Sequence, residues 1–307
     1  MTAPPPPPPE FIGPYRLYTK IFETEHAIVY ESYHEQKCCK LAIKCIKKAK
    51  ANPQAIEDEV NIMRSLQHQN IIQAMDVFDI EFYYCVVMPL ATGGDLFEIV
   101  YQNGKMKEQT VCKIMYSMLQ AIDYCHSIGI MHRDIKPENI FLQNGDLENP
   151  LALLADFGFA KRFNPGQLLN DSVGTPIYAA PEIYLHKPYG EKIDLWSLGV
   201  TMYVLLTAES PFPSGDCHRE IIEARYDFNS EAFDDVSDEA KDLIRWLMEK
   251  DPDRRLSAQE ALNHIWFQSY FPDRNKPIVS RQVAGAISLE QAFDEAEDFD
   301  GFEDEVY

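Results

Sequence analysis

The sequence lacks the marks of several large classes of protein. None of its seven cysteines belongs to a CxxC pair, so neither a zinc site nor a disulfide framework is predicted. No run of about 18 apolar residues occurs, which argues against a membrane-spanning segment. The start, "MTAPPPPPPE", has neither a charged n-region nor an apolar h-region, so we expect no signal peptide. Scattered cysteines are typical of a reducing compartment, and we expect a cytoplasmic location, with the nucleus as the alternative.

Basic residues are also scarce in this chain of 307 residues. Lysine and arginine together number 28 against 49 acidic residues, which gives a formal charge of -21. That charge disfavours nucleic acid or an anionic membrane surface as a partner, and it favours a basic partner or substrate. The hydrophobic content of 46% and the aromatic content of 12% are those of a globular protein with one large core or two smaller lobes.

The two ends of the sequence differ from the rest. Residues 1–14 include six consecutive prolines, which favour a polyproline helix that could dock on an SH3- or WW-like groove, although such a run is more often a solvated tail. Residues 272–307 lose the periodicity of the preceding chain, and the stretch from Glu290 to Tyr307 contains nine acidic residues and no basic one. We interpret both ends as tails.

Between these tails the pattern changes from strands to helices. The runs "AIVYESYHE", "CKLAIKCIKK" and "FYYCVVMP" are rich in β-branched and aromatic residues, as strands are. One helix is predicted to begin at Pro53, with Ile56, Val60 and Met63 on one apolar face. After "ATGGD", long helical patterns such as "KIMYSMLQAIDYCHSIG" and "EAKDLIRWLMEK" predominate. The sequence therefore predicts an α+β fold, with a small β-rich lobe followed by a larger, mainly helical lobe.

Three short motifs carry the functional information. They are "HRDIKPENI" (His132–Ile140), "LLADFGFA" (Leu153–Ala160) and "GTPIYAAPE" (Gly174–Glu182), and "AIK" precedes them. Each is weak alone, but all of them in this order are not expected by chance. Over residues 15–271 the chain resembles a eukaryotic protein kinase of the serine/threonine type, nearest in style to the calcium/calmodulin-dependent group. The resemblance implies the bilobal kinase fold, with an N-lobe at 15–88, a hinge at 89–91 and a C-lobe at 92–271, and it implies ATP and Mg²⁺ as cofactors.

The polar residues of these motifs match the needs of phosphoryl transfer. That reaction needs metal ions on the phosphates, a cation on the nonreacting phosphates and a group that orients the attacking hydroxyl. The resemblance implies that Asp156 and Asn139 hold Mg²⁺ and that Asp134 accepts the proton of the substrate hydroxyl. It implies that Lys136 lies beside the γ-phosphate. The chain has "IKP" (Ile135–Pro137) where a tyrosine kinase more typically has "AAR", so the substrate residue is expected to be Ser or Thr.

The nucleotide site is expected to combine residues of both lobes. A carboxylate at Glu59, beside the apolar helix face, needs a cation, and Lys44 on the preceding strand is the candidate. The resemblance implies that Lys44, held by this pair, contacts the α- and β-phosphates. Pro89 is acceptable in the hinge because kinases use only the carbonyl at that position. The residues implied for nucleotide binding are Ile21, Val29, Ala42, Lys44, Met88, Pro89, Ala91, Asp95 and Phe141.

The activation segment carries a carboxylate where many kinases carry a phosphorylatable threonine. Asp171 stands three residues before "GTPIYAAPE", and we expect it to pair with Arg133 and to order the segment without phosphorylation. Ser172 is the alternative phosphorylation site, and the resemblance implies that Thr175 contacts the catalytic loop. Further residues with implied structural roles are Asp194, which would fix the catalytic-loop backbone, and Glu182 and Arg255, which would pair with each other.

The segment expected to cover the phosphates contains no glycine. Against the kinase pattern G-x-G-x-x-G-x-V, "IFETEHAIVY" has Phe22, Thr24 and Ala27 at the glycine positions. Side chains there hinder close approach of the backbone to phosphates, and Glu23 and Glu25 add like charge. We therefore expect weaker or differently posed ATP.

Three functions remain open on these residues. The leading one is an active ATP-dependent serine/threonine protein kinase, and Asp95, Glu138 and the negative charge favour protein substrates with basic flanking residues. The first alternative is a pseudokinase, a scaffolding module with impaired phosphoryl transfer. The second alternative, a kinase of a small-molecule alcohol, is disfavoured by the peptide-docking segment "GTPIYAAPE".

Overall fold

The computed structural model describes residues 5–50, 53–213 and 217–271, and these residues divide into two compact units. The first unit contains residues 5–50, 53–56 and 74–90 of the described chain. The second unit contains residues 57–73, 91–213 and 217–271. The acidic segment 272–307 and the first four residues of the chain lie outside the described residues.

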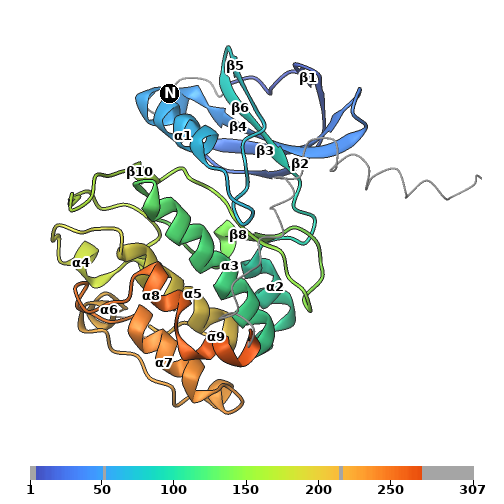
Figure 1. Cartoon of the computed structure of the whole chain (residues 1–307). Coiled ribbons are helices and arrows are strands. Elements are labelled where there is room, and N and C mark those ends of the chain that lie inside the picture. Colours follow the sequence, from blue (N-terminus) through green and yellow to red (C-terminus); the bar gives the residue numbers. More distant parts are fainter. Residues whose placement is uncertain (1–4, 51–52, 214–216, 272–307) are drawn as a thin grey trace, which may run out of the picture. The chain divides into compact units, whose positions relative to one another are not determined.

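The first unit is built on an antiparallel sheet of six strands, drawn in blue to teal in Figure 1. The order across the sheet is β1-β2-β3-β4-β6-β5. The three runs predicted as strands correspond to β3, β4 and β6, which confirms those predictions. The strands are β1 (Phe11–Ile12), β2 (Tyr15–Glu23), β3 (Ala27–His34), β4 (Cys39–Lys47), β5 (Asp76–Ile80) and β6 (Tyr83–Pro89).

The folded sheet starts before Tyr15, the residue at which we expected the domain to begin. Ile12 on β1 pairs with Tyr15 on β2, and its side chain is buried. Further upstream, the Tyr83 hydroxyl donates a hydrogen bond of 2.8 Å to the carbonyl of Pro6. Part of the proline-rich segment is therefore held by the first unit, through the buried side chain of Ile12 and through hydrogen bonds that its composition does not reveal.

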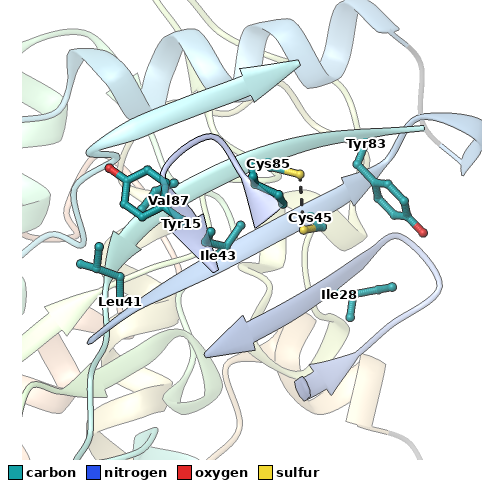
Figure 2. Packing of buried hydrophobic residues seen from close by; sticks show 9 residues of the cluster. Tyr15, Ile28, Leu41, Ile43, Cys45, Tyr83, Cys85 and Val87 are labelled. Atoms are coloured by element: carbon teal, nitrogen blue, oxygen red, sulfur yellow. Dashed lines mark hydrogen bonds between the residues drawn. The ribbon is translucent and has the colours of Figure 1, made fainter. Parts of the chain in front are cut away.

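Buried side chains of β1, β2, β3, β4 and β6 form the core of the first unit (Figure 2). Cys45 on β4 lies directly opposite Cys85 on β6, and their sulfur atoms are joined by a hydrogen bond of 3.4 Å between free thiols. That hydrogen bond and burial raise the pKa of the Cys45 thiol, so this thiol stays protonated within an apolar core. The cluster consists of Ile12, Tyr15, Ile28, Leu41, Ile43, Cys45, Tyr83, Cys85 and Val87.

Helix α1 (Pro53–Ser65) begins at the proline predicted to start it. Ile56, Val60 and Met63 are all buried, which confirms the predicted apolar face. The division between the units falls after Ile56, so Glu59 belongs to the second unit.

The second unit is mainly helical, and it contains both patterns predicted as long helices, now α3 and α7 (Figure 1). Helix α5 is apolar on all sides and buried along nearly its whole length, as a core helix is. The helices of this unit beyond α1 are α2 (Leu96–Asn103), α3 (Glu108–Ser127), α4 (Pro181–Tyr184), α5 (Ile193–Thr207), α6 (Cys217–Glu223), α7 (Asp238–Leu247), α8 (Ala258–Leu262) and α9 (Ile265–Tyr270).

Two small sheets of the second unit were not predicted, because runs of two or three residues carry no periodicity. Strand β7 (Ile130–Met131) pairs with β10 (Lys161–Arg162), and β8 (Ile140–Leu142) pairs with β9 (Ala152–Leu154). Residues 132–139 lie between β7 and β8, and residues 155–160 lie between β9 and β10. The two pairings therefore bring the segments "HRDIKPEN" and "ADFGFA" side by side.

The order of the elements confirms the predicted α+β composition, which is β-rich first and helical afterwards. Within the described ranges, no helix is both long enough and apolar enough to cross a bilayer. The short 3-10 turns are η1 (Lys48–Lys50), η2 (Pro137–Asn139), η3 (Pro176–Tyr178) and η4 (Glu231–Phe233).

Candidate active site

The backbone of the loop 132–139 is fixed by the carboxylate of Asp194 on helix α5. Its oxygens accept hydrogen bonds from the N–H groups of His132, at 3.0 Å, and Arg133, at 2.8 Å. Burial alone would raise the pKa of Asp194, but the adjacent ring of His126, 2.8 Å away, and these backbone bonds lower it. The ionised carboxylate holds Arg133 at a φ of 68°, a left-handed conformation that non-glycine residues rarely adopt. The expected structural role of Asp194 is confirmed, whereas the contact with His126 was not predicted.

Three predicted site residues contact the carboxylate of a fourth, Asp134, which is 4% exposed. One of its oxygens accepts bonds from the N–H and the hydroxyl of Thr175, at 2.8 and 2.7 Å. The other lies 3.0 Å from both the amide nitrogen of Asn139 and the ammonium of Lys136. Lys136 also donates to the Thr175 hydroxyl, at 2.7 Å. The Asp134 carboxylate is thus fixed in one orientation by hydrogen bonds to both of its oxygens.

Gly174 allows the activation segment to approach the loop closely. Its φ is +94°, and a Cβ atom at this position would lie 2.4 Å from the carbonyl oxygen of Arg133. Any side chain would therefore push the segment away and break the bonds from Thr175 to Asp134.

The segments "HRDIKPEN" and "ADFGFA" are joined at Ala155. Its N–H donates to the carbonyl of Asn139 and its carbonyl accepts from Nε2 of His132, both at 2.9 Å. Because a carbonyl can only accept, Nε2 carries the proton of His132, and Nδ1 accepts the N–H of Asp134 at 3.3 Å. These contacts set the position of Asp156, the next residue, whose φ is 58°.

The carboxylates of Asp156 and Glu59 both lie close to Gly158. A Cβ atom at Gly158 would lie 3.3 Å from an oxygen of Asp156 and 3.8 Å from both oxygens of Glu59. All three residues belong to the second unit, whereas Lys44 on β4 belongs to the first. The pairing of Lys44 with Glu59 therefore stays a prediction.

The predicted adenine pocket is also divided between the two units and stays a prediction as a whole. In the first unit, β4 and β6 pair so that Ala42 lies opposite Met88. The other pocket residues of the first unit are Ile21 on β2, Val29 on β3 and Pro89 at the end of β6, and those of the second are Ala91, Asp95 and Phe141.

Asp171 and Arg133 form the expected pair, with 2.7 Å between the carboxylate and the guanidinium. Arg133 also donates to the carbonyl of Phe159, at 2.8 Å, and the Tyr189 hydroxyl donates to the backbone carbonyl of Asp171, at 2.8 Å. The ammonium of Lys161 lies 3.5 Å from the same carboxylate. Partial burial opposes ionisation, but the hydrogen bond and charge of Arg133 lower the pKa of Asp171 to about 2. The Asp171 side chain is therefore a stable anion at neutral pH.

Two further acidic residues have surroundings that the sequence did not reveal. Asp95 is the N-cap of α2 and accepts the N–H of Glu98 at 2.9 Å, a role for which aspartate before a helix is a known signal. Glu138 is partly buried, and one of its carboxylate oxygens is buried without a hydrogen-bond partner among the described residues. Burial, followed by the charges of Asp134 and Asp95, raises the pKa of Glu138, although Lys136 opposes this.

Glu182 and Arg255 form the predicted ion pair in the interior of the second unit. The guanidinium of Arg255 is fully buried and contacts both oxygens of Glu182, at 2.7 and 3.0 Å. It also donates to the carbonyls of Glu249 and Lys192, at 2.8 and 3.0 Å, and lies 5.3 Å from the ring centre of Trp196. The buried guanidinium therefore has partners on all sides. Since Glu182 ends the segment "GTPIYAAPE" and Trp196 belongs to α5, Arg255 links the end of the activation segment to helix α5.

Comparison with known proteins agrees with this geometry. The family described as "Protein kinase domain" matches residues 15–267, and the chain belongs to this family. It is similar to calcium/calmodulin-dependent protein kinase type 1B of Homo sapiens, with 39% identity over 253 residues, which cover 81% of this chain and 71% of the relative. The same kinase of Rattus norvegicus is 37% identical with the same coverage. Calcium/calmodulin-dependent protein kinase type 1 of Caenorhabditis elegans is 39% identical over 230 residues, or 73% of this chain and 66% of the relative.

The predicted resemblance and bilobal α+β kinase fold are thereby confirmed, and so is the leading function. The chain is a serine/threonine protein kinase, a transferase that acts on protein substrates with ATP and, as is usual in this family, Mg²⁺. Neither the geometry nor the comparison supports the pseudokinase alternative.

The buried ion pair leads to a prediction about stability. Replacement of Arg255 by methionine would leave the Glu182 carboxylate buried and unpaired, so we expect Arg255→Met to lower the free energy of unfolding by about 3–5 kcal/mol. The neighbouring Arg254, whose side chain is 68% exposed, provides the matched control, and Arg254→Met should change stability by less than about 0.5 kcal/mol. Urea unfolding followed by fluorescence measures both. Equal stability of the two variants would contradict the role given to Arg255.

Proposed function

We propose that Asp134 accepts the proton of a serine or threonine hydroxyl as the hydroxyl oxygen bonds to the γ-phosphorus of ATP and ADP leaves. The supporting observation is the buried Asp134 carboxylate, held by Thr175 at 2.7 Å and Asn139 at 3.0 Å. A carboxylate fixed in this way needs no reorganisation when the hydroxyl attacks. Lys136, 3.0 Å from Asp134, would stabilise the negative charge of the phosphoryl group in transfer.

Asn139 and Asp156 are the residues that would hold Mg²⁺, which neutralises phosphate charge when bound. The amide nitrogen of Asn139 donates to Asp134, at 3.0 Å to the carboxylate and 2.7 Å to the carbonyl, so its oxygen is the atom suited to a cation. Among the described residues there is no cluster of three or more His, Cys, Asp or Glu side chains suited to a metal ion. Two protein ligands fit Mg²⁺ well, because it usually completes its shell with substrate phosphates and water.

Lys44 would contact the nonreacting phosphates with Glu59 as its counter-ion. Its position supports this, because Lys44 stands on a central strand, opposite Val29 on β3 and Val86 on β6. Glu59 is supported by its place beside Gly158 and Asp156. The adenine ring would lie among the first-unit residues Ile21, Val29, Ala42, Met88 and Pro89 and the second-unit residues Ala91, Asp95 and Phe141.

Asp171 would take the place of a phosphorylated residue in the activation segment. Support comes from its pair with Arg133 and from the second cation, Lys161, 3.5 Å away. Since a carboxylate carries less charge than a phosphate, the ordering would be weaker but permanent. Basal activity is therefore expected without phosphorylation, and Ser172 is the alternative regulatory residue.

Substrates with arginine or lysine upstream of the target hydroxyl would use Glu138 and Asp95. Glu138 offers a carboxylate oxygen that has no partner among the described residues, and an approaching guanidinium would remove the cost of its burial. The raised pKa of Glu138 has the same cause, since burial and nearby acidic residues disfavour its charge until a cation arrives.

The remaining proposals concern the surroundings of the catalytic domain. The domain would comprise residues 15–271, flanked by a proline-rich segment at 1–14 and an acidic tail at 272–307. The prolines would bind an SH3- or WW-type partner, which would compete with the bond from Tyr83 to Pro6.

All seven cysteines are free thiols, which supports a reducing location in the cytoplasm, with the nucleus as the alternative.

Removal of the Asp134 carboxylate tests the proposed mechanism. We expect Asp134→Asn to lower transfer of radiolabelled phosphate to a serine peptide by at least about a hundredfold. A thermal shift with Mg-ATP should remain, because nucleotide binding does not need this carboxylate. Asp238→Asn, at a side chain 99% exposed, is the matched control and should transfer phosphate as the wild type does. Nucleotide binding without Asp134-dependent transfer would instead favour the scaffold alternative.

The Asp171 proposal predicts activity that does not depend on phosphorylation or on pH near neutrality. Phosphatase treatment and Ser172→Ala should leave kcat unchanged, whereas Asp171→Asn should lower it about fivefold, as loss of a half-exposed ion pair implies. Because the pKa of Asp171 is lowered to about 2, the pair persists above the carboxyl's ordinary pKa and is lost only as the pH falls towards 2.

A phosphate in the same place would titrate with a pKa of about 6. The ratio of wild-type to Asp171→Asn activity should therefore stay constant from about pH 5.5 to 8. Loss of all turnover after phosphatase treatment would show that phosphorylation, and not Asp171, orders the segment.

Glu138 is tested by a change in peptide preference. Glu138→Gln should raise KM about tenfold for a peptide with an upstream arginine, because a charge-assisted bond is lost. KM for the same peptide with alanine in place of the arginine should not change, and neither should KM for ATP. Glu148→Gln, at an exposed residue, is the matched control. An equal increase for both peptides would mean that Glu138 only supports the loop.

A further inference from the structure

The glycine-free segment forms a closed hairpin tip between β2 and β3. The N–H of Thr24 donates to the carbonyl of Ala27 at 2.8 Å. The N–H groups of Ala27 and His26 donate to the Thr24 hydroxyl, at 3.0 and 3.3 Å. Three backbone N–H groups of the tip therefore donate within the tip itself.

The hydroxyl of Thr24 takes the place of its own backbone carbonyl in this turn. In an ordinary two-residue hairpin, the residues at positions 24 and 27 would exchange two N–H to carbonyl bonds. Here Ala27 donates to the hydroxyl of Thr24, and the Thr24 carbonyl accepts from the ammonium of Lys47, at 2.9 Å. A glycine at position 24 has no hydroxyl and could not make this arrangement.

Lys47 at the end of β4 binds the tip at three points. Its backbone N–H donates to the carbonyl of His26, at 2.8 Å, and its ammonium donates to Thr24 and to the carboxylate of Glu23, at 2.9 and 2.7 Å. Its side chain is 11% exposed, so it is held in place. Lys20, which is 52% exposed, binds the other oxygen of Glu23, at 2.9 Å. The bonds from Lys47 and then Lys20 lower the pKa of Glu23 to about 2.

These contacts have two consequences for a triphosphate. An N–H group that already donates inside the tip is not available to a phosphate oxygen unless the tip opens. The charge of Glu23, which would otherwise repel phosphate, is balanced by the two lysines. The hairpin is thus suited to meeting a nucleotide without changing shape, and this saves the entropy cost of ordering a flexible loop.

We propose that Lys47 is a positioning residue for ATP, which locks the tip through Thr24 and Glu23 so that the loop meets the nucleotide as a prefolded hairpin. The contacts of the loop with ATP are made by side chains of the hairpin strands, such as Ile21 and Val29, and not by a cradle of backbone N–H groups. The proposal rests on the kinase function proposed above and assigns the loop's part in it.

The test compares two lysine variants of the full chain. Lys47→Met and Lys20→Met each remove one cation from Glu23, but only Lys47→Met also releases the Thr24 carbonyl. We expect Lys47→Met to raise KM for ATP about three- to tenfold, with kcat changed less than about twofold. Lys20→Met should raise KM less than about twofold, and this increase should shrink at high salt because it comes from charge alone. Equal effects of the two variants would overturn the proposal.

Hydrogen exchange of the backbone N–H groups of Thr24, His26 and Ala27 provides a readout that does not depend on activity. In the wild type without nucleotide these groups should exchange slowly, and Mg-ADP or a nonhydrolysable Mg-ATP analogue should change the rates less than about twofold. Lys47→Met should speed exchange about fivefold or more. Fast exchange that slows when nucleotide is added would show a phosphate cradle and overturn the proposal. A chain that exchanges as expected but transfers no phosphate would contradict only the proposed function.

Discussion

The catalytic loop depends on one buried carboxylate, that of Asp194. The left-handed backbone at Arg133 costs about 1–2 kcal/mol in a non-glycine residue, and two hydrogen bonds from consecutive N–H groups to Asp194 offset it. From this one bend, Arg133 reaches Asp171 and the next residue, Asp134, reaches Thr175. The same carboxylate therefore sets the position of Asp134, the proposed acceptor of the substrate proton, and of the arginine that pairs with Asp171 in the activation segment.

The activation segment is joined to the loop at two points that share one backbone bend. Arg133 binds Asp171, and Asp134 binds Thr175, while Gly174 passes too close to the Arg133 carbonyl for any side chain. Because residues 133 and 134 are neighbours, a shift of the segment at Asp171 strains the bonds at Thr175. An anion at position 171 is thus connected to the Asp134 carboxylate through a short path, which is the physical basis of the proposal that Asp171 takes the place of a phosphate.

The parts of the site that the sequence predicted are those whose chemistry demands a residue type at a fixed spacing. Asp134 and Asn139 stand in one loop, and the anion at 171 stands where an arginine must be neutralised. The parts it missed are contacts between segments far apart in the chain, such as His126 with Asp194 and Tyr189 with Asp171, which leave no local pattern. The sequence does contain the signal for the N-cap, an aspartate directly before a helical pattern, but Asp95 was interpreted as a nucleotide- and substrate-binding residue. Strands of two residues, such as β7 and β10, are too short for any periodicity to show.

The glycine-free loop shows why a missing pattern is a poor guide to a missing function. In a glycine-rich loop, the absence of side chains lets the backbone come close to the phosphates. Such a sequence therefore favours a flexible loop. The hairpin in this chain is instead held in one shape, since Thr24 closes the turn and Lys47 on β4 binds it. In the sequence, Lys47 is one lysine among several and Thr24 is one departure from the glycine pattern. Only the register of β2, β3 and β4 brings them together, and the resulting rigidity offers a physical alternative to the flexibility that the sequence lacks.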